Sequence, residues 1–215
     1  MDVDPHIEYK ILLLGDTTVG KTSLLVKYLD NKDYDNASST IGVDVRYKDI
    51  VKGDKRIRLQ YLDTAGQERF KSLANNYLNG MNGALLVFDI TKKDTLKSLK
   101  FWIDAIKEKV SNENVELIVV ENKIDLENER EITKDSINDF GIKHNFEVLS
   151  TSAKTGQGVE EAFNHLIDKL INNKNIGIEI NAKENNDAFN NRKKTFQVKV
   201  NDNNSKKSNK KKCEC

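Results

Sequence analysis

The chain has 215 residues, of which 37% are apolar and 32% charged, and its formal net charge is +1. This length suits one domain of moderate size with an appendage, and it can bury a full hydrophobic core. No run approaches the roughly 20 apolar residues of a membrane-spanning helix. The acidic start, Met1 to Pro5, lacks the apolar core of a secretion signal, so we expect neither a membrane span nor secretion.

Apolar runs and amphipathic segments alternate along residues 8–172. The runs predict strands at 8–14, 43–47, 56–62, 84–88, 117–120 and 146–149. The amphipathic segments predict helices at 22–30, 95–110, 133–144 and 159–172. The second and third strands flank Lys52-Gly53-Asp54 and suggest a hairpin. We therefore predict an α/β fold of the P-loop NTPase type, with a mixed, mainly parallel six-stranded sheet and helices on both faces.

The segment between the first strand and the first helix, Gly15 to Thr22, fits the pattern G-x-x-x-x-G-K-[ST]. In such a loop, backbone amides and the positive end of the helix converge on one anion. We expect Lys21 to reach the β and γ phosphates of a nucleotide and the Thr22 hydroxyl to bind Mg²⁺. A chance match is the alternative, which the flanking strand and helix disfavour. The motif predicts a nucleotide without specifying its base.

More polar motifs follow predicted strands, whose carboxyl ends gather ligands in sheets of this kind. Asp63 could hold Mg²⁺, Gly66 could bring its amide against a γ-phosphate, and Gln67 could orient an attacking water. Thr40, in a polar stretch, could close on Mg²⁺ when the γ-phosphate is present. Taken singly these are ordinary residues: Asp63 could cap a helix and Gln67 could be solvated.

Two further motifs predict which base is bound. Asn122-Lys123-Ile124-Asp125 follows the fifth strand, and Ser152-Ala153-Lys154 follows the sixth. The Asp125 carboxylate can accept hydrogen bonds from guanine N1–H and the exocyclic amine, and adenine offers no matching pair. The other expected contacts are Asn122 on the base edge, the stems of Lys123 and Lys154 over the ring, and the Ala153 amide on O6.

The last 42 residues have a different composition from the rest. Residues 174–215 hold 11 Lys or Arg against 5 Asp or Glu, a balance of +6, so residues 1–173 carry −5. Because this segment is rich in Asn and Lys and poor in apolar residues, we expect a folded domain over 1–174 and a flexible basic tail over 175–215. The only two cysteines, Cys213 and Cys215, end the tail, so the body has no disulfide, which suits the cytosol.

Five lysines precede this terminal Cys-Glu-Cys. Two prenyl chains would meet the two-signal requirement for stable anchoring, and lysines near anionic lipid would add to it. A solvated tail that binds nucleic acid weakly is the alternative.

Taken together, G-D-T-T-V-G-K-T, S-T-I-G-V-D, L-D-T-A-G-Q-E-R-F, N-K-I-D and T-S-A-K, with the basic tail and its Cys-Glu-Cys end, resemble the Rab family of small GTPases. The resemblance covers roughly residues 8–173 and the last three. It implies a monomeric switch in vesicle trafficking that binds GTP or GDP with Mg²⁺, hydrolyses GTP slowly without an activating protein, and has no specific nucleic-acid partner. It also implies an exchange factor, a GTPase-activating protein, a GDP-dissociation inhibitor and effectors.

The resemblance also assigns residues. It implies catalysis by Gln67, Lys21 and Thr40, and Mg²⁺ held by Thr22, Thr40 and Asp63. It implies prenylation of Cys213 and Cys215, which would place the protein on the cytoplasmic face of intracellular membranes with a cytosolic pool. The implied nucleotide contacts are Gly15, Thr17, Thr18, Val19, Gly20, Lys21, Thr22, Ser23, Tyr34, Thr40, Asp63, Gly66, Asn122, Lys123, Asp125, Ser152, Ala153 and Lys154.

Several positions depart from the usual Rab pattern. Val45 and Leu62 stand where most Rabs carry Phe and Trp, so effector choice does not transfer. Asp33 stands at the usual place of the aromatic that flanks guanine, and Tyr34 follows one residue later. Thr18 replaces a common glycine. Glu121 replaces a small residue, and its carboxylate beside the predicted base site has no assigned role.

Two other functions stay open at this point. A scaffold that holds nucleotide without cycling is motivated by Val45, Leu62 and Asp33, whereas intact Gln67 and Thr40 argue against it. A nucleic-acid-binding protein is disfavoured because the basic charge is confined to the tail.

Overall fold

The computed structural model describes residues 6–32, 43–53, 55–64, 77–110, 115–173 and 178–180. Each predicted strand and helix is present, with ends shifted by a few residues. The elements are β1 (His6–Leu14), α1 (Lys21–Asp30), β2 (Val43–Lys52), β3 (Lys55–Thr64), β4 (Gly83–Asp89), α3 (Lys93–Lys109), β5 (Glu116–Asn122), the 3₁₀ helix η3 (Ile124–Glu129), α4 (Lys134–His144), β6 (Glu147–Ser150), α5 (Val159–Asn172) and β7 (Ile178–Ile180).

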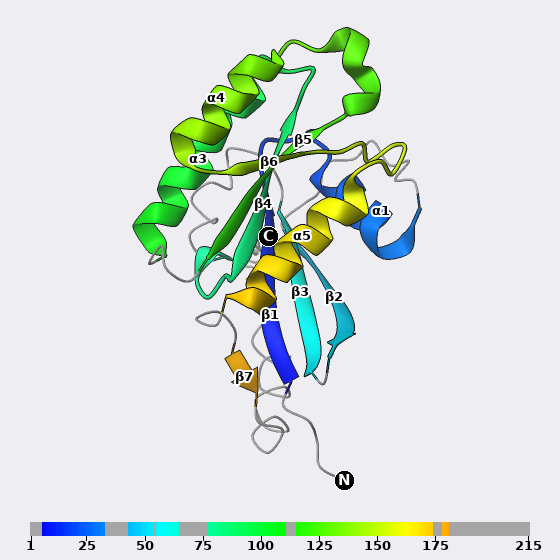
Figure 1. The fold of residues 1–215 in the computed structure, drawn as a ribbon, viewed down its shortest axis with the longest axis vertical. Helices are drawn as coiled ribbons and strands as arrows, with labels where there is room; N and C mark the ends of the chain where they lie inside the picture. Colours follow the sequence, from blue (N-terminus) through cyan, green and yellow to red (C-terminus); the bar gives the residue numbers. More distant parts are fainter. Residues whose placement is uncertain are drawn as a thin grey trace, which may run out of the picture. The chain divides into compact units, whose positions relative to one another are not determined.

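The main sheet has the strand order β2-β3-β1-β4-β5-β6. The hairpin partners β2 and β3 are antiparallel, while β3, β1, β4, β5 and β6 run parallel to one another. The predicted six-stranded, mainly parallel sheet is therefore confirmed. Because the parallel strands share one direction, their carboxyl ends meet at one edge of the sheet (Figure 1).

Strand β7 was not predicted. It pairs antiparallel with the start of β1, His6 to Glu8, at the end of β1 that is remote from the Gly15 loop. Three residues are too few to produce a recognisable alternation of apolar and polar side chains. The strand lies beyond residue 174, in the stretch that the composition assigns to the tail.

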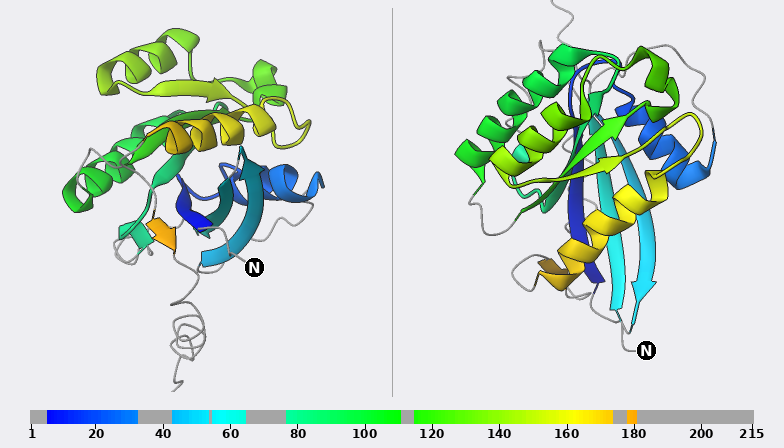
Figure 2. Two further views of the ribbon diagram at one scale, coloured as in Figure 1. Left: turned by 60° about the horizontal axis from the view of Figure 1, so that its bottom comes forward. Right: turned by 45° about the horizontal axis from the view of Figure 1, so that its top comes forward.

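Helices cover both faces of the sheet, and α5 crosses in front of it (Figures 1 and 2). Alternate residues of one strand serve the two faces, since successive side chains of a strand point in opposite directions. Ile11 and Leu13 pack in a cluster with residues of α1 and α5. Leu12 and Leu14 pack in a second cluster with residues of α3 and α4. Both faces of β1 are thus buried, as its nearly continuous apolar sequence indicates.

Local signals explain where the helices begin and end. Thr133 is the N-cap of α4, and its Oγ1 accepts a hydrogen bond from the Ser136 amide at 3.2 Å. Asn145 ends the same helix in the left-handed conformation, with φ 57°. In the described part of the chain, no helix combines the length and apolar character needed to cross a bilayer.

Candidate nucleotide site

The loop from Gly15 to Gly20 connects β1 to α1 and passes close to neighbouring backbone and side chains. Gly15 has φ 145°, and a Cβ there would lie 2.1 Å from the Val87 carbonyl oxygen. Gly20 has φ 97°, and a Cβ there would lie 2.4 Å from Nδ2 of Asn122. Both glycines are required because any side chain would push the loop away from β4 and β5.

Lys21 is the first residue of α1 and has only 5% of its surface exposed. Its ammonium donates hydrogen bonds to the carbonyl oxygens of Gly15, at 3.0 Å, and Asp16, at 2.8 Å. Burial lowers the pKa of Lys21 to about 8, while the carboxylates of Asp63 and Asp16 act in the opposite direction. A desolvated cation at the start of a helix, wrapped by a glycine loop, fits a phosphate group.

Thr22 and Asp63 meet beside Lys21. Thr22 Oγ1 donates a 2.5 Å hydrogen bond to Oδ2 of Asp63, which is 1% exposed near the end of β3. The next residue, Thr64, donates to the Leu13 carbonyl oxygen at 2.7 Å and so ties β3 to β1. Hydroxyl and carboxylate oxygens are the donors that Mg²⁺ prefers, so this pair fits the ion that the sequence predicts.

Asn122, at the end of β5, connects three loops through one side chain. Its Nδ2 donates to the Val19 carbonyl oxygen at 2.8 Å. Its Oδ1 accepts from the Ala153 amide at 3.1 Å and from Thr151 Oγ1 at 3.2 Å. Asn122 therefore holds the phosphate loop and the two predicted base loops together. The sequence motifs predict a different contact for this side chain, with the edge of the guanine base. The Ala153 amide, assigned there to guanine O6, here donates to Asn122.

Asp125 and Ser152, which the sequence predicts to recognise the base, lie together. Ser152 Oγ donates to Asp125 Oδ1 at 2.6 Å and accepts from the Thr155 amide at 3.1 Å. Ser152 is buried, whereas Asp125 is exposed. The buried hydroxyl thus fixes the orientation of an exposed carboxylate, which is the arrangement that recognition of two neighbouring N–H groups requires.

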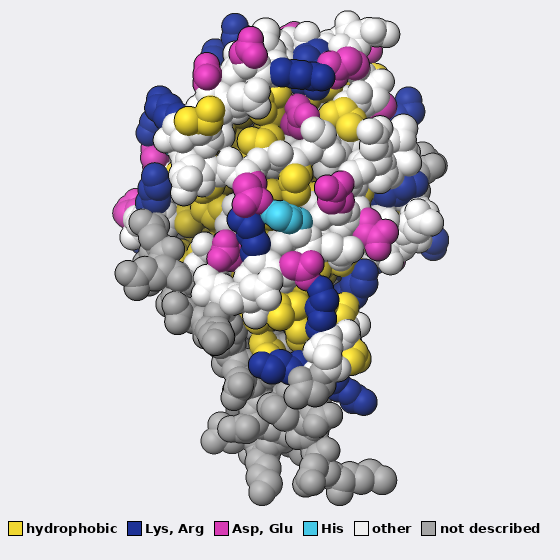
Figure 3. All heavy atoms as spheres, viewed as in Figure 1, with side chains coloured by type: hydrophobic (Ala, Val, Ile, Leu, Met, Phe, Trp, Pro, Cys, Tyr) yellow, Lys and Arg dark blue, Asp and Glu magenta, His cyan; other side chains and the backbone are white. Residues whose placement is uncertain are grey.

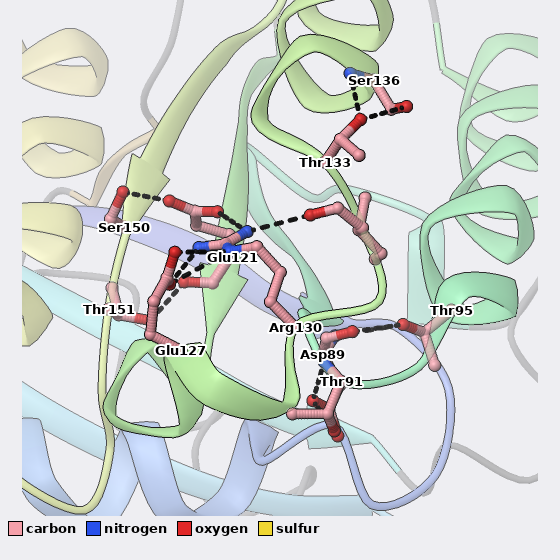
Figure 4. Close-up of polar contacts among 11 residues, drawn as sticks. Asp89, Thr91, Thr95, Glu121, Glu127, Arg130, Thr133, Ser136, Ser150 and Thr151 are labelled. Atoms are coloured by element: carbon pink, nitrogen blue, oxygen red, sulfur yellow. Dashed lines mark hydrogen bonds and ion pairs between the residues drawn. The ribbon is translucent and has the colours of Figure 1, made fainter.

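Asp89 contacts the candidate site through Lys123, although the sequence motifs did not include it. It ends β4, has no exposed surface, and its Oδ2 lies 2.6 Å from Nζ of Lys123. Burial opposes its ionisation, but hydrogen bonds from Lys123 and Thr91 outweigh burial, so the pKa of Asp89 lies below its ordinary value. Figure 4 shows Asp89 between Thr91 and Thr95. The signal was available, because Asp89 directly follows an apolar run, as Asp63 does.

Some of the remaining residues predicted to contact the nucleotide, metal or lipid are described by the structure, and others are not. Val19 is buried, Thr17 and Ser23 are half-buried, and Thr18 and Lys154 are exposed. The residues that lie outside the described part of the chain are Tyr34, Thr40, Gly66, Gln67, Cys213 and Cys215.

Comparisons with known proteins agree with this geometry. The model of the Ras family matches residues 10–172. The chain belongs to the Rab branch of the Ras family. Rab-18-B of Danio rerio is 38% identical over 171 residues, which cover 80% of this chain and 83% of the relative. Rab-13 of Mesocricetus auratus is 37% identical over 163 residues, covering 76% and 80%. RABC1 of Arabidopsis thaliana is 38% identical over 178 residues, covering 81% and 84%.

The activity of this Rab-type GTPase is the hydrolysis of GTP to GDP and phosphate, and its role is in vesicle trafficking. Ras-family GTPases bind guanine nucleotides with Mg²⁺, and Rab proteins act with exchange factors, activating proteins, GDP-dissociation inhibitors and effectors, typically on endomembranes. The comparisons give no support to a scaffold that does not cycle.

Proposed function

We propose that residues 1–174 form a GTP-dependent switch whose nucleotide lies along the carboxyl edge of the sheet, and that residues 175–215 form its membrane anchor. One observation carries the first half of this proposal. The side chain of Asn122 joins the loop of Lys21 to the loop of Ala153, which supports a phosphate site and a base site on one continuous surface.

At the phosphate end, the amides from Gly15 to Ser23 and the ammonium of Lys21 bind the phosphate oxygens. Thr22 and Asp63, joined at 2.5 Å, would hold Mg²⁺ together with Thr40. When bound, the ion would supply positive charge against the phosphate oxygens during hydrolysis. Gln67 orients the attacking water, and Gly66 donates its amide to the γ-phosphate.

At the base end, the Asp125 carboxylate accepts hydrogen bonds from the N1–H and the exocyclic amine of guanine. Ser152 Oγ donates to one oxygen of that carboxylate at 2.6 Å. Lys123, kept in place by Asp89, and Lys154 cover the faces of the ring, with Tyr34 beside it. When the base binds, the Ala153 amide donates its hydrogen bond to guanine O6 in place of Asn122 Oδ1.

Replacing Gln67 tests the hydrolytic role. Gln67→Leu keeps the volume of the side chain and removes the group that orients water. We expect single-turnover GTP hydrolysis to slow by at least about tenfold, while GTP affinity stays unchanged. The matched control is Gln60→Leu on β3, where the amide donates to the exposed Tyr47 hydroxyl. Equal hydrolysis rates in the parent and Gln67→Leu would refute the assignment.

The tail requires a separate test. We propose that Cys213 and Cys215 are prenylated and that the lysines before them contact anionic lipid on the cytoplasmic face of endomembranes. Replacing both cysteines with serine should move the protein from the membrane fraction of cells to the soluble fraction. GTP binding by the soluble variant should equal that of the parent, because the anchor is separate from the nucleotide site. Retention of the double variant on membranes would contradict the anchor.

Effectors would read the GTP state through the switch segments around Thr40 and Gln67, whose order depends on the γ-phosphate and Mg²⁺. An exchange factor would release GDP, an activating protein would supply an arginine as a further catalytic cation, and a GDP-dissociation inhibitor would extract the GDP form. The distribution of charge on the face shown in Figure 3 fits a nucleotide switch better than a nucleic-acid-binding protein. Over most of the face in Figure 3, Lys and Arg alternate with Asp and Glu, whereas nucleic-acid binding calls for one basic patch.

A further inference from the structure

Glu121 carries a carboxylate that the proposed nucleotide contacts do not use. It is the next-to-last residue of β5, has 8% of its surface exposed, and pairs in register with Ser150 of β6. Ser150 Oγ donates to one oxygen of its carboxylate, and Nη1 of Arg130 lies 3.2 Å from the other. Figure 4 shows this carboxylate between Ser150 and the guanidinium of Arg130.

Arg130 connects this carboxylate to the loop that follows β5. Its side chain is 11% exposed and it directly follows η3, the short helix that contains Asp125. The guanidinium also donates to the Ile132 carbonyl oxygen at 3.3 Å and to Glu127 through Nε and Nη2, at 2.8 to 3.0 Å. The end of η3 is therefore held against β5 by a planar group with several fixed contacts.

These contacts lie at the base of both loops that carry the proposed guanine contacts. Glu121 immediately precedes Asn122, and Ser150 is two residues before Ser152. The backbone strengthens the same junction, because the Thr151 amide donates to the Glu121 carbonyl oxygen at 2.7 Å. A buried carboxylate is costly unless it is paired, so Ser150 and Arg130 are held at the distances that Glu121 dictates. Arg130 directly follows the helix that contains Asp125, and Ser150 is two residues from Ser152, so a shift of either partner would be transmitted through a short stretch of chain.

We propose that Glu121 and Arg130 are positioning residues for guanine recognition, setting the Asp125 carboxylate against Ser152. The inference rests on the proposed function, since it concerns the base end of that site. Glu121 touches no part of the nucleotide. It acts through the two loops, so its removal weakens the contacts that distinguish guanine and leaves the phosphate end intact.

The test compares GDP with inosine diphosphate, which lacks the exocyclic amine from which Asp125 would accept a hydrogen bond. Affinities of the full chain for both are measured with Mg²⁺ in the parent, Glu121→Gln and Arg130→Met. We expect GDP to bind about tenfold more weakly in each variant and the GDP-to-inosine-diphosphate affinity ratio to fall. Single-turnover GTP hydrolysis of the preloaded variants should match the parent, since Lys21, Thr22 and Asp63 are undisturbed.

Two further variants sharpen the result. Glu116→Gln removes a carboxylate at the opposite end of β5, where it accepts from Asn173 at 2.9 Å, and should leave the affinity ratio unchanged. The exchange Glu121→Ser with Ser150→Glu moves the carboxylate to the register partner on β6, and is designed to restore its pairing with the Arg130 guanidinium. It should restore the ratio to within about threefold of the parent.

The outcomes separate the inference from the proposed function. A parent that binds neither nucleotide would refute the proposed function. If the parent binds GDP but the variants lose GDP and inosine diphosphate equally, with a lower melting temperature, then Glu121 and Arg130 only stabilise the fold and the inference is overturned. Failure of the exchanged pair to restore the ratio would also overturn it. Glu121→Gln keeps the volume of the side chain, so the comparison does not depend on a variant with a cavity.

Discussion

Gly158 and Gly80 have the same φ angle in different surroundings. Both have φ 68°, but a Cβ on Gly158 would lie 2.0 Å from the Ser150 carbonyl oxygen, whereas a Cβ on Gly80 would meet nothing within 4 Å. An alanine at either position costs about 1 kcal/mol of left-handed strain. Gly158→Ala must also displace the end of β6, at about 2 kcal/mol more. We expect Gly158→Ala to lower the free energy of unfolding by about 3 kcal/mol and Gly80→Ala to lower it by about 1 kcal/mol. Both losses are measured by urea denaturation without nucleotide. Equal losses would show that the close approach to β6 has no energetic weight.

Thr18 shows how a residue other than glycine is accommodated in the phosphate loop. It has φ 63°, a conformation that is unfavourable for a β-branched side chain. Its Oγ1 accepts a 3.1 Å hydrogen bond from Nζ of Lys92. This contact offsets part of the strain, and it exists only because Thr18 has a hydroxyl where many Rabs have glycine.

Helix α5 is fixed to the rest of the domain by aromatic packing. Phe163 stacks on Tyr28 of α1, with ring centroids 4.2 Å apart and planes 3° apart. It meets Tyr61 of β3 edge to face at 5.7 Å. Phe163→Ala should therefore lower the free energy of unfolding by about 3 to 5 kcal/mol, as measured by chemical denaturation. Phe101→Ala on α3, where the side chain is 37% exposed, should cost about 1 kcal/mol or less. Similar losses in the two variants would mean that α5 depends on other contacts.

At the scale of the whole molecule, nucleotide and metal should stabilise the fold together. A ligand that binds only the folded state adds about 4 kcal/mol at a thousandfold excess over its Kd. We expect GDP with Mg²⁺ to raise the melting temperature of the parent, and removal of Mg²⁺ by EDTA to reverse most of that gain. Thr22→Asn disrupts the 2.5 Å contact with Asp63 and should lose the Mg²⁺-dependent part of the gain. An equal rise with ATP would contradict the guanine site.

The sequence was sufficient to predict the longer strands and helices and the order of the motifs. Strands and helices have side-chain periods of 2 and 3.6 residues, and these repeats are visible in the chain itself. The run before Gly15 and the amphipathic stretch after Thr22 predicted the phosphate loop correctly as a connection between a strand and a helix. Strand β7 was missed because its 3 residues are too few to show the alternation of a strand, and η3 because its 6 residues span less than two turns of 3.6 residues.

Only the tertiary structure decided which side chains support the site. Asn122 reaches Val19 across 103 positions of sequence, and Glu121 reaches Ser150 across 29. Such contacts depend on how β4, β5 and β6 are aligned in the sheet, and a shift of one residue would turn Glu121 to the opposite face. The residue types and their order determined the chemistry that this chain offers a nucleotide. The register of the sheet decided which carboxylates hold that chemistry in place, because strand pairing brings together residues that no local pattern relates.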